Sequence, residues 1–266
     1  MGLKGHIRYV VSIMTRFFFV LILTLLLCAP ARSDDMRVYT ELAGNAVFKK
    51  GHKIGGGDVN LVRELMKRVG TDAEIEVVPW QRGYEAVLNE SNVALFPTTL
   101  TKERESRFYW VGPLFRLKWV FWARKGHGAK INSLEDARRV GSIGTYYKDA
   151  RERFLLSRGF TNLKSANNNI VNYRKLAEGR LDLVLSSNIG LQVSAELAGV
   201  SPDSFEQAFV VREVDLYLAI SKSTKPAIVK IWKKAFQSML DDGTFQRIYR
   251  EWQPLEIPPV VPLPVQ

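Results

Sequence analysis

Short apolar runs alternate with amphipathic segments over most of the chain, and this alternation predicts strands separated by helices. The runs that fit buried or half-buried strands stand at 37–41, 73–78, 93–96, 140–143 and 181–185. One amphipathic helix is predicted between Asp58, a suitable N-cap, and Gly70, a suitable C-terminal stop. Because helices separate the strands, we expect a mostly parallel sheet.

The second half of the chain repeats this pattern. An aromatic-rich run at 116–124 predicts a long strand, and 213–220 predicts another. Gly144 and Thr145 are expected to open a helix at 146–157. Further helices are predicted at 173–178, 226–240 and 244–252. The last ten residues, 257–266, contain four prolines and predict an extended tail.

Hydroxyl and guanidinium groups follow the strand predicted at 93–96. Thr98 and Thr99 come directly after it, Thr101 can cap a short helical turn, and Arg104 lies inside that turn. Arginine presents a planar set of N–H donors that fits a carboxylate with two hydrogen bonds, and open α/β sheets bind ligands beyond the carboxyl ends of their strands. These residues predict a site for a small anion. The alternative is a surface arginine paired with a neighbouring glutamate.

Residues 1–33 have the layout of a signal peptide. Basic residues precede an apolar run at 17–28 and small residues follow it, so cleavage is expected after Ala31 or Ser33. The run is shorter than the roughly 20 residues that span a bilayer, and an uncleaved anchor is the alternative. Cys28 could indicate a lipoprotein, but lipid attachment usually requires a small residue before the cysteine, and Leu27 is not small. We therefore expect a periplasmic protein.

The composition narrows the classes of protein that fit. The 266 residues suit one large domain or two modest ones. Beyond residues 1–33, which hold four basic residues and no acidic ones, 34 basic and 27 acidic residues give a net charge of +7. This surplus is scattered, so nucleic acid is not expected as a partner. With no cysteine after the signal and with His52 and His127 in predicted loops, we expect no metal site, no cofactor and no Ser-His-Asp triad.

Four passages of the sequence, taken together, indicate a protein family more specifically than any one of them does alone. In order, they are TLTKER at 99–104 followed by FYWVGP at 108–113, VGSIGT at 140–145, LAEGRLD at 176–182 and DGTFQRI at 242–248. With this combination the chain resembles the extracytoplasmic solute-binding proteins of family 3, a group typified by the polar amino-acid receptors of ABC importers. The resemblance covers about residues 36–252.

The resemblance implies an α/β fold of the two-lobed, periplasmic-binding-protein type. Each lobe would be a mostly parallel sheet flanked by helices, and two strands would join the lobes as a hinge. Lobe 1 would comprise residues 34–116 and 213–256, and lobe 2 would comprise residues 117–212. A solute would bind in the cleft, and the lobes would close on it.

The resemblance also implies ligand contacts at particular positions. Arg104 matches the arginine that clamps the ligand carboxylate in this family, and Thr99 matches the neighbouring hydroxyl contact. Thr145 matches a second donor to that carboxylate, at the start of a helix whose N-terminus favours an anion. Glu41 stands where many members have an acidic residue, and Trp80 stands near the position of an aromatic wall of the cleft.

The chain departs from the family after the strand predicted at 181–185. Amino-acid receptors of this family usually have an aspartate there, which pairs with the ammonium group of the ligand. Ser187 and Asn188, both neutral, occupy the turn in this chain and are candidate ligand contacts. A buried ammonium group needs a nearby carboxylate. Either this chain has no carboxylate for the ammonium group of a ligand, or Glu41 takes the place of the missing aspartate.

Three functions stay open at this level. The leading hypothesis is a non-enzymatic, monomeric receptor that binds a small carboxylate-bearing solute, an amino acid or a related organic acid, and presents it to the permease of an ABC importer. The second is a periplasmic enzyme on the same fold, similar to cyclohexadienyl dehydratase, with Glu41 as an acid. The third is a ligand-sensing partner of a membrane receptor, whose binding site would look the same.

Overall fold

The computed structural model describes residues 36–42, 47–126, 130–254, 256 and 258–259. Residues 36–266 form one compact unit. The predicted signal peptide, residues 1–33, and most of the predicted tail, residues 257–266, lie outside the described residues. Within the described ranges, no helix is long and apolar enough to cross a membrane.

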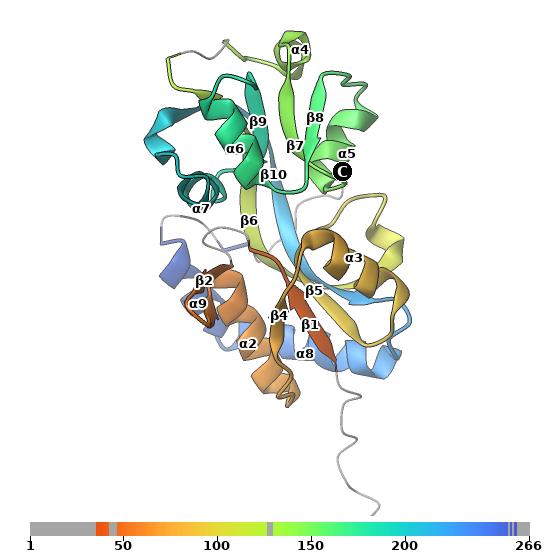
Figure 1. Cartoon of the computed structure of the whole chain (residues 1–266). Coiled ribbons are helices and arrows are strands. Elements are labelled where there is room, and N and C mark those ends of the chain that lie inside the picture. Colours follow the sequence, from red (N-terminus) through yellow and green to blue (C-terminus); the bar gives the residue numbers. More distant parts are fainter. Residues whose placement is uncertain (1–35, 43–46, 127–129, 255, 257, 260–266) are drawn as a thin grey trace, which may run out of the picture. The chain divides into compact units, whose positions relative to one another are not determined.

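In the described part of the chain, eight strands form one sheet in the order β4-β1-β5-β10-β6-β9-β7-β8. At one end three strands pair in parallel: β4 (Ile75–Val77), β1 (Arg37–Thr40) and β5 (Val93–Thr99). At the other end a second parallel group consists of β9 (Leu183–Ser187), β7 (Ile143–Tyr146) and β8 (Leu163–Ala166). Two long antiparallel strands join the groups (Figure 1), namely β6 (Phe108–Arg124) and β10 (Phe205–Ser221).

Helices accompany each group of parallel strands (Figure 1). Those with the first group are α2 (Gly57–Val69), α3 (Trp80–Asn89), α8 (Pro226–Asp241) and α9 (Thr244–Trp252). Those with the second group are α4 (Leu134–Arg139), α5 (Ala150–Ser157), α6 (Asn169–Ala177) and α7 (Leu191–Leu197). We call the two assemblies lobe 1 and lobe 2. The predicted fold class, two α/β lobes joined by two strands, is confirmed.

Short elements complete the chain. A hairpin is formed by β2 (Phe48–Lys50) and β3 (Lys53–Gly55), and the 3-10 turns are η2 (Glu105–Arg107) and η3 (Pro202–Ser204). The sequence analysis did not predict this hairpin. It also missed β8 and α7.

The two joining strands are longer than the sequence predicts. Each has 17 residues, whereas the apolar runs indicated 116–124 and 213–220. Leu216 pairs with Phe115 and Leu218 pairs with Val111, so the register shifts around the Gly-Pro pair and the strand continues past it. The crossing points predicted between the lobes, 116–117 and 212–213, both fall inside these strands.

An ion pair links the two joining strands beside those crossing points. Arg116 on β6 lies opposite Asp215 on β10, with Nε–Oδ1 and Nη2–Oδ2 distances of 2.7 and 3.1 Å. The Asp215 side chain is 3% exposed. Because a bidentate arginine–carboxylate pair has a fixed geometry, it favours a single register between the strands at this point.

The start of α2 differs from the prediction, whereas its end agrees. The helix follows Gly56, whose φ of 127° is a conformation that favours glycine, and Asp58 lies within the first turn without capping it. Gly70 ends the helix in the left-handed conformation (φ 79°), and its N–H bonds back to the carbonyl groups of the last turn, as predicted.

Asp58 is a buried carboxyl group with an unusual environment. It is fully buried, and neither of its carboxyl oxygens has a hydrogen-bond partner among the described residues. Burial therefore raises the pKa of Asp58 well above its ordinary value of 3.8. Because the pKa in the folded state lies above that in the unfolded state, stability from this group is complete below the unfolded pKa and is lost as the pH rises through the folded pKa.

Asp58→Asn should therefore raise the urea midpoint at about pH 8, since the amide carries no charge to bury. The gain should shrink as the pH falls through the raised folded pKa of Asp58, because the wild-type carboxyl group then takes up a proton in the fold. Asp203→Asn, at an exposed aspartate of η3, is the matched control and should leave both midpoints unchanged. A variant less stable than wild type at pH 8 would mean that Asp58 is charged and satisfied in the fold.

Candidate functional site

A cavity of about 460 Å³ lies between lobe 1 and lobe 2. Lobe 1 lines it from the ends of β1, β4 and β5 and the start of α3, and lobe 2 lines it from the segments after β7 and β9 and the starts of α5 and α6. The carboxyl ends of parallel strands in both lobes thus face one space, which is where open α/β sheets bind ligands.

The cavity brings together five of the seven residues that the sequence singled out. These five are Glu41, Trp80, Thr99, Arg104 and Ser187. The other two, Thr145 and Asn188, do not line it.

Arg104 is buried rather than exposed at the surface. Its side chain is 2% exposed, and its guanidinium group lies 5.3 Å from the ring centre of Trp80 and 4.9 Å from that of Tyr84. The interpretation of Arg104 as a surface arginine is therefore wrong. Its backbone N–H bonds to the carbonyl of Thr101, and the short helical turn begins one residue later, at Glu105.

The Arg104 guanidinium group still has donor capacity. Its Nη2 is buried and has no hydrogen-bond partner among the described residues. Burial lowers the pKa of Arg104, although an arginine this basic stays protonated. A buried cation with a free donor at the wall of a cavity is a binding group for an anion, because leaving it unpaired costs desolvation energy.

Lobe 2 contributes an ion pair that the sequence analysis missed. The Asp149 side chain caps α5 by accepting hydrogen bonds from the N–H groups of Arg151 and Glu152, at 2.8 and 3.1 Å. Its second oxygen accepts a hydrogen bond from Arg151 Nε at 2.6 Å. Both side chains line the cavity and neutralise each other there. An aspartate directly before a helical segment is an N-cap signal that could have identified Asp149.

Thr145 lies inside β7 and not at a helix start, which corrects the helix predicted at 146–157. Its hydroxyl donates to Glu152 at 2.8 Å, and the N–H of Lys148 donates to the other oxygen of Glu152 at 2.6 Å. Ser165 on β8 also donates to this carboxylate. The buried Glu152 thus holds the turn that presents Tyr146 and the ion pair to the cavity.

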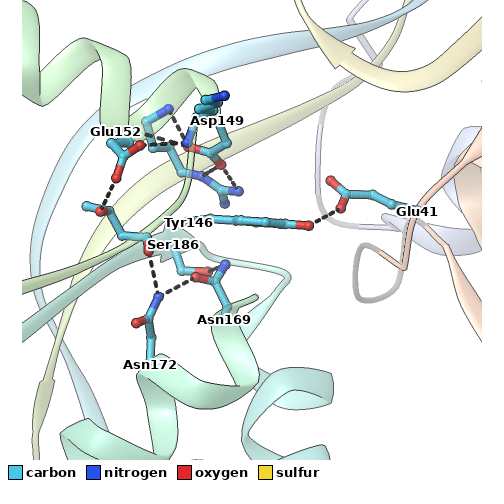
Figure 2. Close-up of polar contacts among 10 residues, drawn as sticks. Glu41, Tyr146, Asp149, Glu152, Asn169, Asn172 and Ser186 are labelled. Atoms are coloured by element: carbon cyan, nitrogen blue, oxygen red, sulfur yellow. Dashed lines mark hydrogen bonds and ion pairs between the residues drawn. The ribbon is translucent and has the colours of Figure 1, made fainter. Parts of the chain in front are cut away.

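Tyr146 extends from that turn toward Glu41 of lobe 1 (Figure 2). The phenol O–H donates to Glu41 Oε2 at 3.2 Å. Burial raises the pKa of Glu41 to about 7, while the charge of Arg151 and the hydrogen bond from Tyr146 oppose this rise. Glu41 therefore titrates near neutral pH at the junction of the lobes.

A second contact links the lobes nearer the surface. Arg153 on α5 and Glu103, just before Arg104, approach to 2.5 Å. Both side chains are about 40% exposed, so this pair contributes little to stability.

Ser187 and Asn188 take different positions after β9. Ser187 is buried and lines the cavity. Asn188 instead accepts a hydrogen bond from the N–H of Lys118 on β6 at 2.9 Å, so its side chain fixes the end of β9 to a joining strand.

Amide groups at the start of α6 also line this side of the cavity. Asn168 caps α6, and Asn169 donates to Ser186 Oγ at 3.4 Å. Asn172, one turn on, donates to the Thr145 carbonyl and to Asn169, which Figure 2 shows. These amide groups donate to one another and to neighbouring oxygens, while the buried Oδ1 of Asn172 has no partner among the described residues.

The described residues contain no group of three or more His, Cys, Asp or Glu side chains that could hold a metal ion. Chemically, the cavity offers one cation with a free donor, one carboxyl group that titrates near pH 7, and hydroxyl and amide groups. This arrangement suits the binding of a small anion or zwitterion.

Comparison with protein families gives a match over most of the chain. The model of the bacterial extracellular solute-binding proteins, family 3, matches residues 43–254. Among curated proteins, no sequence matches the chain.

Solved structures with the same fold have different roles. A histidine kinase sensor domain with similarity to periplasmic binding proteins has a TM-score of 0.72 at 14% identity, over 82% of this chain and 97% of that one. The substrate-binding protein of an ABC uptake transporter from Streptococcus pneumoniae, with bound histidine, has a TM-score of 0.70 at 16% identity, over 84% of this chain and 94% of that one. An ancestral amino-acid-binding protein, a precursor of cyclohexadienyl dehydratase, has a TM-score of 0.66 at 21% identity, over 82% of this chain and 94% of that one. At sequence identities of 14–21%, this structural similarity establishes the fold alone.

Proposed function

Because the chain belongs to the bacterial extracellular solute-binding proteins of family 3, we propose that it is a periplasmic receptor for a small carboxylate-bearing solute, an amino acid or a related organic acid. The observation that carries this proposal is the buried guanidinium group of Arg104, whose Nη2 has no partner among the described residues. A ligand carboxylate would satisfy it with a charge-assisted hydrogen bond.

Other residues of the cavity complete the proposed site. Thr99 would donate its hydroxyl beside Arg104, Trp80 would form a wall, and Ser187 would contact the ligand from lobe 2. In place of the missing aspartate, Glu41 would take an ammonium group. Thr145 and Asn188 would act indirectly, through the hydrogen bonds that fix the segments after β7 and β9.

Hinge closure is the proposed mechanism. The ligand would contact residues of both lobes, so that it binds the closed form more tightly than the open form and shifts the population toward it. The bond from Tyr146 to Glu41 and the pair of Arg153 with Glu103 would form on closure. The closed, monomeric complex would then be recognised by the permease of an ABC importer, or by a membrane sensor. Residues 1–33 would direct export and be removed after Ala31 or Ser33.

An enzyme on the same fold is a second candidate, because Glu41 has a pKa of about 7 in a cleft. A carboxyl group with that pKa can act as a general acid or base. One experiment separates the two: a thermal-shift screen of amino acids and organic acids, followed by mass spectrometry of each stabilising compound after incubation. Saturable stabilisation without product supports the receptor. Product formation supports the enzyme, and the absence of any stabilising acid contradicts both.

The affinity for an amino acid should depend on pH through Glu41. Because burial raises the pKa of Glu41 to about 7, the group is protonated below that pH and must release a proton before it can pair with an ammonium group. Calorimetry should therefore find binding about tenfold weaker at about pH 6 than at about pH 8.

Two controls separate this effect from a general influence of pH. Glu41→Gln should bind the amino acid weakly, with little difference between the two pH values. The matching acid without an amino group should show no such pH dependence with the wild-type protein. An unchanged pH dependence in Glu41→Gln would remove Glu41 as the partner of the ammonium group.

A further inference from the structure

Apolar side chains gather at the mouth of the cavity. Seven large hydrophobic side chains of the described residues are exposed, and three of them line this one space: Leu42, Val77 and Leu197, at 43%, 36% and 54% exposure. Single exposed hydrophobic residues are ordinary on a protein surface, whereas several around one concave site indicate a surface that binds an apolar group.

These three residues come from both lobes. Leu42 follows β1 and Val77 ends β4 in lobe 1, while Leu197 ends α7 in lobe 2. Val193, one helical turn before Leu197, also lines the cavity, because residues four apart lie on one face of a helix. The apolar surface of the mouth thus continues inward along α7.

The charged groups of the cavity leave no partner for a charged ligand side chain. Among the described residues, four charged side chains line it: Glu41, Arg104, Asp149 and Arg151. The last two neutralise each other as an ion pair. Under the proposed function, Arg104 takes the ligand carboxylate and Glu41 takes the ammonium group. A further charge on the ligand would be buried without a counter-ion, at a high cost.

The cavity is also wide enough to hold a side chain. Its volume of about 460 Å³ lies in the range of pockets that enclose ligands larger than the smallest amino acids. A ligand side chain in the cavity would contact these residues and remove part of their apolar surface, with its own, from water.

We infer that the solute carries an uncharged, apolar side chain, aliphatic or aromatic, which Leu42, Val77 and Leu197 cover at the mouth of the cavity. This inference rests on the proposed function, since it places the carboxylate at Arg104. It assigns the receptor to apolar amino acids or their organic-acid analogues, and not to cationic or acidic ones.

Calorimetric titration with a homologous series tests this inference. The series is alanine, 2-aminobutyrate, norvaline and norleucine, with phenylalanine, lysine, arginine and glutamate for comparison. Affinity should rise about fourfold for each methylene group that enters the apolar surface. Leu197→Ser should weaken norleucine binding by about threefold to tenfold and alanine binding by less, so that the gain in affinity from alanine to norleucine shrinks.

Leu156→Ser is the matched control. Leu156 is a leucine on a lobe 2 helix with almost the same exposure, 55%, but it does not line the cavity. This variant should bind every compound as the wild type does. A flat series, a charged amino acid as the tightest ligand, or equal effects of the two substitutions would overturn the inference. If short amino acids still bound in an Arg104-dependent way, the proposed function would stand alone; if no compound bound, both would fail.

Discussion

Arg104→Ala should weaken binding of the carboxylate solute by about tenfold to 150-fold, because a hydrogen bond to a charged group contributes about 1.5–3 kcal/mol. Arg104 is 2% exposed, the Nη2 of its guanidinium group has no partner among the described residues, and the aromatic rings of Trp80 and Tyr84 hold this group at the cavity wall. Alanine supplies no donor at this position. Isothermal titration calorimetry with an acid from the thermal-shift screen measures the loss.

Arg107→Ala is the control for this experiment. Arg107 lies three residues further on, its side chain is 44% exposed, and it does not line the cavity. It should leave the affinity within about twofold of wild type. Arg104→Lys keeps the charge but not the planar set of donors, so we expect an intermediate affinity. Circular dichroism establishes that each variant is folded. Unchanged affinity in folded Arg104→Ala would exclude Arg104 from the site.

Asp149→Ala should lower the free energy of unfolding by about 3–5 kcal/mol, since removing one partner of a buried pair leaves an uncompensated charge. The side chains of Asp149 and Arg151 are 8% and 16% exposed, and Asp149 also accepts the two N–H bonds that cap α5. The substitution therefore removes a counter-ion and a helix cap together. Urea unfolding at neutral pH measures the change.

Two further variants separate these contributions. Asp149→Asn keeps an acceptor for the cap and removes the charge, so its cost should be smaller than that of alanine. Ser133→Ala removes the cap of α4, where Ser133 accepts from the N–H of Asp136, and should cost about 1 kcal/mol. If Asp149→Ala cost no more than Ser133→Ala, the ion pair would contribute nothing to the fold.

The sequence predicts most of the parallel strands, and the position of Arg104 after one of them, because these signals are local. Apolar runs separated by amphipathic helices indicate a parallel sheet, and the hydroxyl-rich passage places Arg104 beyond the carboxyl end of β5. The strand itself extends to Thr99, so Thr98 and Thr99 lie in it, whereas the sequence predicted them after it. β8, with the sequence LKSA, was missed because it has too few apolar residues to show a strand pattern. Its strand conformation comes from pairing with β7.

The position of Thr145 illustrates a different limit. Glycine and threonine after an apolar run favour a helix start, but pairing with β8 extends β7 to Tyr146, and the stronger cap at Asp149 sets the start of α5. The bond between Tyr146 and Glu41 joins residues 105 positions apart, so no local pattern reveals it. The sequence therefore located the strand ends that line the cavity but not the contacts across it.

The capture of a carboxylate is tested most directly by comparing a stabilising amino acid with its own carboxamide. The two compounds match in size and keep the same ammonium group, but the amide has no negative charge for Arg104. At about 100 times its dissociation constant, the acid should stabilise the fold by about 2.7 kcal/mol and raise the melting temperature by about 5–10 °C. At the same concentration the amide, bound about tenfold to 150-fold more weakly, should stabilise the fold by about 1.4 kcal/mol at most and raise the melting temperature by correspondingly less. Equal shifts from the acid and the amide would contradict a carboxylate site at Arg104.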